Sequence, residues 1–287
     1  MLLYQTLMNL VPGYKEEIRE TAKYLAPIPN NLDYYVLGST TGFYAYDFQG
    51  IGINGFNGAI EAQTVSYDYR LLLQYHKKIK TGGVIIWSPC LFSLYVSEYN
   101  EISRHIRYYY ILEKSNIYNY NINGKVRAVS YPLLRLLKHS LFPINDKTFS
   151  LEETARNRYI GWKKEFSLDD DNVSKRDDRD NTLKYTISYL NKIISLCREN
   201  NFNFTIVIPP VSTAMTRYIH NEDLERYLIS HLKRLDKDIP VFNYFCDDFF
   251  SDNRWFFSAD CMNETGRKLF TKEVVEKVGR FYDQASR

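Results

Sequence analysis

The chain has 287 residues, enough for one large α/β domain or for a domain with a sizeable insertion. Its 37 Lys and Arg residues nearly balance its 34 Asp and Glu residues, and this even charge argues against a nucleic-acid-binding protein. The four cysteines show no CxxC pair and no Cys/His spacing of a zinc site, and they are too few for a disulfide scaffold. We therefore expect reduced thiols, a cytoplasmic protein, and no bound metal or other cofactor.

The N-terminal stretch from Met1 to Val11 is apolar but does not resemble a signal peptide. It has no basic n-region and no small-residue cleavage site, and it is about half the length of a membrane span. No other segment approaches a transmembrane helix, so we expect no direct membrane span. Lys15 to Leu25 has the spacing of a short amphipathic helix that stops before Pro27.

The first strand is predicted at residues 34–37, and it ends abruptly in Gly38-Ser39. This arrangement places a hydroxyl where a buried strand turns towards a helix, and ligands bind at such positions in open α/β sheets. Ser39 is therefore a candidate nucleophile. The alternative is that Ser39 or Thr40 only caps the helix that follows.

A glycine-rich stretch at 50–58 is interpreted as a short strand that runs into a turn. It contains neither of the phosphate-binding motifs GxxxxGK[ST] and GxGxxG. Residues 59–80 are predicted to form a long helix with a basic end, closed by Gly82-Gly83. The continuous apolar run at 84–87 is typical of a strand buried on both faces.

Tyrosines crowd the region of about 91–150, which we interpret as an insertion or a lid over the sheet edge. Such a cluster suits either a packing surface or the stacking of sugar rings. Residues 167–181 are mostly charged or polar with both signs mixed, and they are predicted to form a solvated loop.

The rest of the chain alternates helix and strand. Helices are predicted at 182–199, 224–235 and 263–281, and strands at 204–208 and 241–244. This order predicts a single α/β domain, residues 1–287, in which a mostly parallel sheet lies in a three-layer α/β/α fold.

The strand that ends in Gly38-Ser39, the buried strands near 84 and 204, and the loop 255–266 before the last helix together resemble the SGNH/GDSL hydrolase superfamily. The resemblance is to the SGNH-like proteins of bacterial capsule and surface-polysaccharide gene clusters. It implies a flavodoxin-like topology and a serine nucleophile after the first strand. It also implies a base histidine in a DxxH sequence before the last helix, here followed by Met262-Asn263-Glu264-Thr265-Gly266.

The sequence departs from this pattern where the chemistry needs it most. Alignment through Asn263 puts Cys261 at the position of the family histidine and Ser258 at that of the aspartate. A serine is a poor nucleophile without an adjacent base. The family's GxND sequence is also absent, so the oxyanion donors would be the backbone N–H groups of Ser39 and near Gly55, with the Asn57 side chain as a further candidate.

Two functions from different classes remain open. The first is an esterase or O-acetyltransferase that acts on a polysaccharide or its precursor, or on another acylated small molecule, with Ser39 as nucleophile and Asp260 as a possible substitute base. The second is a catalytically inactive SGNH-like domain that binds a glycan or a partner in polysaccharide biosynthesis. A third option, Cys261 as a thiolate nucleophile, would need a lowered thiol pKa, and a buried structural thiol is preferred.

Overall fold

The computed structural model describes residues 2–97, 105–141, 149–166 and 173–285. Five parallel strands form the central sheet in the order β2-β1-β3-β4-β5, which is a flavodoxin-like order. The four predicted strands are confirmed, and the glycine-rich stretch adds a fifth. The strands are β1 (Leu32–Gly38), β2 (Gly55–Asn57), β3 (Ile79–Ser88), β4 (Asn203–Ile208) and β5 (Val241–Asn243).

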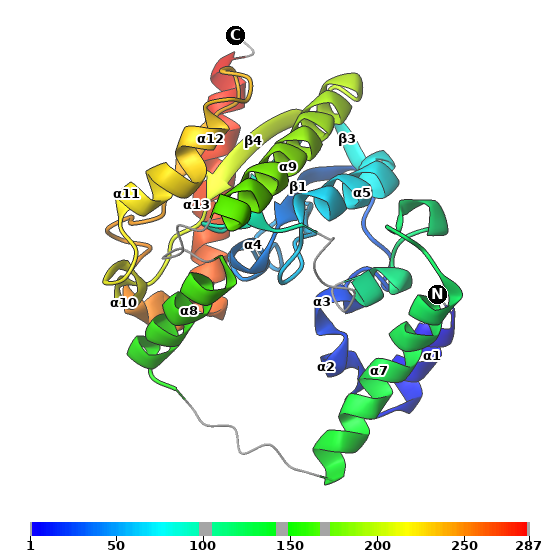
Figure 1. Ribbon diagram of the computed structural model, residues 1–287. Coiled ribbons are helices and arrows are strands. Elements are labelled where there is room, and N and C mark those ends of the chain that lie inside the picture. The colour runs from blue at the N-terminus through cyan, green and yellow to red at the C-terminus, as the bar shows by residue number, and fades with distance from the viewer. Residues whose placement is uncertain (1, 98–104, 142–148, 167–172, 286–287) are drawn as a thin grey trace.

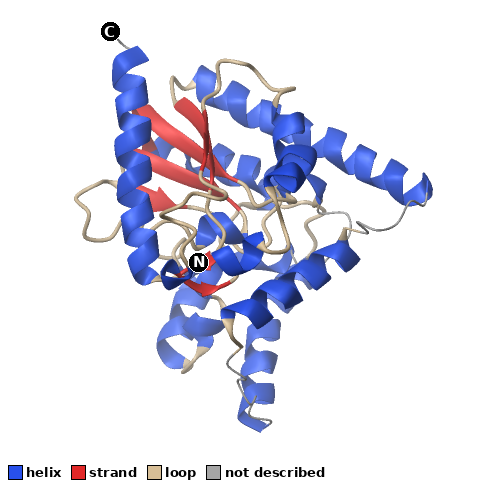
Figure 2. Cartoon of the chain, turned by 90° about the vertical axis from the view of Figure 1, so that its left-hand side faces the viewer, coloured by secondary structure: helices blue, strands red, loops and turns tan. Residues whose placement is uncertain are grey.

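Helices cover both faces of this sheet, as Figures 1 and 2 show, so the three-layer α/β/α architecture is confirmed. Helix α13 (Glu264–Ala285) packs on one face, while α5 (Val65–Tyr75) and α9 (Val173–Glu199) lie together on the other. The alternation of side chains along each strand supplies both cores, because consecutive residues point to opposite faces. In β1, for example, Val36 belongs to the core under α13, and Leu37 belongs to the larger core on the other side.

The remaining elements lie at the ends and edges of the sheet. Helices α1 (Leu2–Leu10), α2 (Tyr14–Glu17) and α3 (Arg19–Ala22) open the chain, and α4 (Thr40–Phe43) follows β1. Helix α7 (Ile122–Leu141) packs on α2, and α8 (Leu151–Glu165) begins with a Ser150–Glu153 capping box. The other short elements are α10 (Thr213–Thr216), α11 (Asn221–Leu224), a π-helical turn (Glu225–Ile229), α12 (Ser230–Leu232) and the hairpin strands β6 (Phe256–Ser258) and β7 (Cys261–Met262).

The helix predicted at 59–80 is shorter in the structure, where α5 ends at Tyr75 and residues from Ile79 belong to β3. The two glycines that looked like a helix stop instead extend the strand. Gly82 donates its N–H to the Asn201 carbonyl (2.8 Å), and its φ of +76° suits glycine. The strand begins at Ile79, where it pairs with Leu32 of β1, and a local sequence pattern cannot reveal such a pairing.

The prediction of a loop at 167–181 is wrong for its second part, because α9 begins at Val173, and residues 167–172 lie outside the described residues. Residues 173–181 contain neither Gly nor Pro, so their strongly polar composition does not prevent them from forming the first part of a long helix. The tyrosine-rich region holds short 3₁₀ turns and α7. Figure 1 shows α7 beside the N-terminal helices rather than over the sheet. The helix that reaches the end of the sheet is α8, just beyond that region.

Within these described residues, no helix has both the length and the apolar character needed to cross a membrane. Nor does any group of three or more His, Cys, Asp or Glu side chains in that part of the chain form an arrangement suited to a metal ion.

Candidate functional site

The ends of β1 and β3 meet where the chain connections diverge. From β1 the chain runs to β2 on one side, and from β3 it runs to β4 on the other. Ligands bind outside the carboxyl ends of the strands at such a point. Gly38 ends β1 with a φ of +139°, and a Cβ there would lie 2.1 Å from the Ser88 carbonyl oxygen. Glycine is therefore required for the two strand ends to approach, and Ser39 follows at once.

A cavity of about 90 Å³ lies at this point. Its walls come from the start of α4, from the loop that precedes α5, from the segment after β3, from α8 and from the loop before α13. This volume has room for a few water molecules or a small chemical group. The lining residues are Ser39, Thr40, Ala62, Gln63, Cys90, Val96, Arg158, Trp162, Glu165, Phe166 and Asp260.

The Ser39 side chain is buried, with 7% of its surface exposed, and it lines this cavity. Although Ser39 occupies the N-cap position of α4, its hydroxyl does not cap the helix, and it makes no hydrogen bond to any residue in the described ranges. The neighbouring Thr40 hydroxyl instead accepts a hydrogen bond from the Ala62 N–H (3.2 Å). Ser39 thus offers the cavity an uncommitted donor and acceptor.

The predicted base Asp260 lines the same cavity as Ser39, but it is paired with a cation. Arg158 of α8 approaches Asp260 Oδ1 with both Nε (3.1 Å) and Nη2 (3.0 Å), and the side chain of Asp260 is 1% exposed. The Asp260 charge is also the main reason why the pKa of Arg158 is raised. A carboxylate held in an ion pair of this kind is a hydrogen-bonded structural partner rather than a free proton acceptor.

The two cysteines near this site are thiols rather than thiolates. Burial, reinforced by the nearby Asp260 charge, raises the pKa of Cys261 well above its usual value. Its Sγ donates to Asp260 Oδ1 (3.6 Å). Burial likewise raises the pKa of Cys90, whose Sγ accepts a hydrogen bond from Ser93 (3.3 Å). A nucleophilic cysteine needs the opposite environment, so the third option loses its support.

One wall of the cavity is the loop formed by residues 59–63. Ala62 adopts a φ of +50°, a left-handed conformation that is rare outside glycine and is often found at functional sites. Two contacts hold the loop in this shape from the cavity side. The Ala62 N–H is bonded to Thr40, and the Gln63 side-chain amide donates to Asp68.

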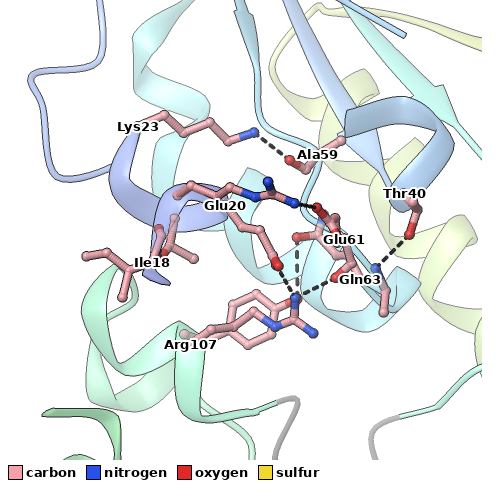
Figure 3. A network of polar contacts seen from close by, with 12 residues as sticks. Ile18, Glu20, Lys23, Thr40, Ala59, Glu61, Gln63 and Arg107 are labelled. Carbon is pink, nitrogen blue, oxygen red and sulfur yellow. Dashed lines mark hydrogen bonds and ion pairs between the residues drawn. The ribbon is translucent and has the colours of Figure 1, made fainter. Parts of the chain in front are cut away.

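The end of α3 and the 3₁₀ turn Arg107–Tyr110 hold the same loop from behind, as Figure 3 shows. Lys23 donates to the Ala59 carbonyl (2.5 Å). Arg107 donates to the Glu61 carbonyl (2.5 Å) and forms an ion pair with Glu20 (2.5 Å). Thr40, Asp68, Lys23 and Arg107, from four separate parts of the chain, thus define this wall of the cavity.

Asp68 of α5 is a buried carboxyl group directly behind the turn. It accepts hydrogen bonds from the Gly38 N–H (2.8 Å), from Trp87 Nε1 (3.0 Å) and from the Gln63 amide. Burial raises the pKa of Asp68 to about 7 in spite of these three donors. The carboxyl group therefore positions both the end of β1 and the cavity loop.

The candidate oxyanion donors Gly55 and Asn57 lie elsewhere. Gly55 pairs with Tyr34, near the start of β1, and donates its N–H to the Ile53 carbonyl (3.0 Å). Asn57 Nδ2 donates to three backbone carbonyls (each 3.1 Å), and its Oδ1 accepts from the Ala59 N–H. Neither residue lines the cavity. The Asn57 amide is thus engaged in holding the chain after β1.

The two positions that the SGNH/GDSL resemblance assigns to an aspartate and a histidine are neighbours in space. Ser258 and Cys261 are paired across the β6–β7 hairpin just before α13. This hairpin brings Asp260 to the cavity, whereas Ser258 and Cys261 do not line it.

None of the five histidines, all of which lie in the described part of the chain, lines the cavity. Each has a local role instead. His105 Nδ1 bonds to Tyr67 (2.8 Å), His231 Nε2 bonds to Tyr95 (2.8 Å), and His139 approaches Glu17 (3.4 Å). His76 bonds to the Leu73 carbonyl (2.8 Å), and His220 occupies the N-cap of α11.

Sequence reasoning missed the contribution of α8 to this site. Arg158, Trp162 and Phe166 line the cavity from this segment, and no motif marks them. The capping box at Ser150 could have located the helix, but its docking on the sheet end depends on contacts between distant parts of the chain.

Comparison with known proteins gives little further information. No family model matches the chain, and no curated protein matches it. A solved structure described as a "putative platelet activating factor from Streptococcus pneumonia" aligns with 96% of this chain and 98% of its own, with a TM-score of 0.41 and 11% sequence identity. The functional argument therefore rests on the residues of the cavity.

Proposed function

We propose that this chain is a catalytically inactive SGNH-like domain that binds a surface polysaccharide or its precursor, with one small substituent seated beside Ser39. The observation that carries the proposal is the set of neighbours of Ser39. An Arg158–Asp260 ion pair stands where an active hydrolase needs a base and the carboxylate that orients it, and every histidine is engaged elsewhere. A serine hydroxyl in such surroundings can bind but is not activated to attack.

The cavity suits a small polar substituent such as an acetyl group. Ser39 supplies an uncommitted hydroxyl, and Arg158 carries five N–H donors, of which the contacts to Asp260 use only part. Trp162 and Phe166 supply apolar walls. A volume of about 90 Å³ is too small for a whole sugar ring, so the ring itself would remain outside.

An esterase or O-acetyltransferase with Ser39 as nucleophile is the second candidate. One observation favours it: Ser39 and a buried carboxylate, Asp260, line the same cavity at the end of the sheet. This function requires Asp260 to release Arg158 and to accept the Ser39 proton.

Hydrolysis of p-nitrophenyl acetate separates the two functions. We expect the protein to show no rate above the uncatalysed background and Ser39→Ala to change nothing. Fast hydrolysis that Ser39→Ala abolishes and that the exposed control Ser188→Ala retains would establish the esterase instead.

Binding is tested separately by ligand-observed NMR with N-acetylglucosamine and glucose. We expect the acetylated sugar to bind better and Ser39→Ala to weaken its binding about fivefold, the loss expected for one hydrogen bond. Equal signals from both sugars, or no effect of Ser39→Ala, would contradict the proposed seat of the substituent.

We also propose a cytoplasmic location. All four cysteines are free thiols, and burial is the main cause of a raised pKa in each of them. Such a set suits a reducing compartment. Alkylation of the native and of the unfolded protein, isolated with its thiols trapped, would show whether all four remain reduced in the cell.

A further inference from the structure

Helix α7 presents an apolar stripe to solvent. Five aliphatic residues on it are between 60% and 73% exposed, although an amphipathic helix normally buries such side chains. At about 100° of rotation per residue they lie along one side of the helix. Exposed apolar surfaces of this extent mark interaction sites. The stripe consists of Ile122, Val126, Leu134, Leu137 and Leu141.

The outward orientation of the stripe follows from the way in which α7 is attached. Pro132 has no N–H, so the Ala128 carbonyl four residues earlier lacks its helical partner, and the Tyr110 hydroxyl donates to it instead. Ala128 and Pro132 are both buried. Arg135 lies about one turn after Pro132 and two turns after Ala128, and it holds the helix again by pairing with Glu17 (3.1 Å). The attached side and the apolar stripe are about half a turn apart around the helix.

The charge of α7 has one sign. The helix contains Lys125, Arg127, Arg135 and Lys138 and no Asp or Glu. Lys125, Arg127 and Lys138 are exposed. Helix α1 carries no charged residue, and its Leu10 is 74% exposed. Figure 1 shows α7 beside the N-terminal helices, of which α2 and α3 also carry Glu16, Glu17 and Glu20. The combination of exposed aliphatic side chains with charge of a single, positive sign is thus a property of α7 itself.

We infer that α7 docks on an anionic lipid bilayer, with the axis of the helix in the plane of the surface. The aliphatic stripe would enter the boundary between headgroups and acyl chains, while the lysines keep their ammonium groups among the lipid phosphates. Such a helix lies on the membrane and does not cross it. The cytoplasmic leaflet supplies the required negative surface.

Charge and shape favour this occupant over a protein. A symmetric dimer formed through the apolar stripe would place two α7 helices side by side, and their positive charges would repel each other. On one flank of the stripe Val129, Leu133 and Leu136 are half-buried against the core, whereas Arg127 and Lys138 are exposed on the other flank. A fluid apolar layer can cover such a convex surface without a complementary groove.

The test is cosedimentation of the full chain with large unilamellar vesicles. We expect binding to vesicles made from phosphatidylcholine and phosphatidylglycerol, and at least tenfold weaker binding to phosphatidylcholine alone. Binding should also weaken when NaCl is raised from about 0.1 M to about 1 M, because the Debye length falls from about 10 Å to about 3 Å.

Two sets of variants locate the contact. Leu134→Glu with Leu137→Glu should reduce binding to the anionic vesicles at least tenfold, whereas Leu269→Glu on α13 should leave it unchanged. Lys125→Ala with Lys138→Ala should weaken binding, and Lys272→Ala with Lys277→Ala on α13 should not. The lysine pair keeps the test decisive if circular dichroism shows that the leucine variant does not fold.

Three outcomes would overturn the inference. The first is no binding to either kind of vesicle. The second is binding that is insensitive to every α7 variant. The third is a dimer, or a complex with an acidic protein, that the α7 variants dissociate while vesicle binding is absent; this would assign the stripe to a protein interface.

Discussion

At the end of β1, the missing side chain of Gly38 allows the Ser88 carbonyl to lie against its Cα. On the other side of the turn, the Asp68 carboxyl group accepts a hydrogen bond from the Gly38 N–H. The turn that presents Ser39 is thus defined by a steric requirement on one side and a buried hydrogen bond on the other. Both requirements can be tested one residue at a time.

Gly38→Ala should be strongly destabilising, because the new Cβ would meet backbone at 2.1 Å and the φ of +139° disfavours any side chain. We expect a loss of about 3 kcal/mol or more in the free energy of unfolding, measured by urea denaturation. Gly50→Ala is the matched control, because its φ is +73° but no atom lies within 4 Å of the new Cβ. It should cost only about 1 kcal/mol, the price of the left-handed conformation alone. Equal losses in the two variants would contradict the steric argument.

Asp68 should make stability depend on pH. Burial raises its pKa from 3.8 to about 7 in the folded protein, so between these values the folded state binds more protons than the unfolded state. The contribution of Asp68 to the free energy of unfolding is therefore fully present below about pH 4 and is lost as the pH rises towards 7. The difference of about three pKa units corresponds to about 4 kcal/mol at most.

Asp68→Asn removes this titration while keeping an acceptor for the Gly38 N–H. We expect urea denaturation between pH 4 and 7 to show a smaller decline of stability with pH in the variant than in the parent protein. Parallel profiles would mean that other groups cause the decline.

At the residue scale, Ser39 could be predicted because a strand ending in Gly-Ser is a local pattern. Its surroundings could not. Arg158 reaches Asp260 across 102 positions of the chain, and nothing near either residue in the sequence indicates the pair. Asn57 illustrates the converse: an amide at a plausible position is fully engaged by backbone carbonyls that only the folded turn brings together.

At the scale of the elements, the buried strands were predictable because continuous apolar runs of that length are distinctive. Their boundaries were less so. The segment 77–83 resembles the end of a helix, because Lys77, Lys78 and Lys80 suit a helix C-terminus and two glycines follow. In the structure a strand begins instead at Ile79, which pairs with Leu32 of β1. Helix α7 shows a further effect, in which a proline within a helix is accommodated by a side chain from elsewhere.

The Tyr110–Ala128 hydrogen bond can be tested with a double-mutant cycle. Tyr110→Phe leaves the Ala128 carbonyl without a partner and should lower the free energy of unfolding by about 1 to 3 kcal/mol. In a Pro132→Ala background the new N–H can bond to the same carbonyl, so Tyr110→Phe should cost about 1 kcal/mol less. Additive effects in thermal or urea denaturation would show that the tyrosine does not replace the missing helical bond.

At the scale of the whole molecule, the order of helices and strands predicted the layered parallel sheet correctly, because crossover connections leave few topologies open. Ser39 and Asp260 come from opposite ends of the chain and line one cavity at the carboxyl edge of this sheet. Which chemistry they support depends on α8 and on the N-terminal helices behind the 59–63 loop, and these are arrangements of the complete fold.

The position of α13 in the chain bears on how the protein folds during its synthesis. This helix follows every strand of the sheet, yet its Phe270, Val274 and Val278 supply one side of the core over β1, β3 and β4. While translation proceeds, that face of the nascent sheet has no cover until residues 264–285 have emerged from the ribosome. The opposite face can close earlier against α5 and α9. Chaperone contacts should therefore concentrate on a half-covered intermediate whose open side carries Tyr34, Val36, Val84 and Ile86.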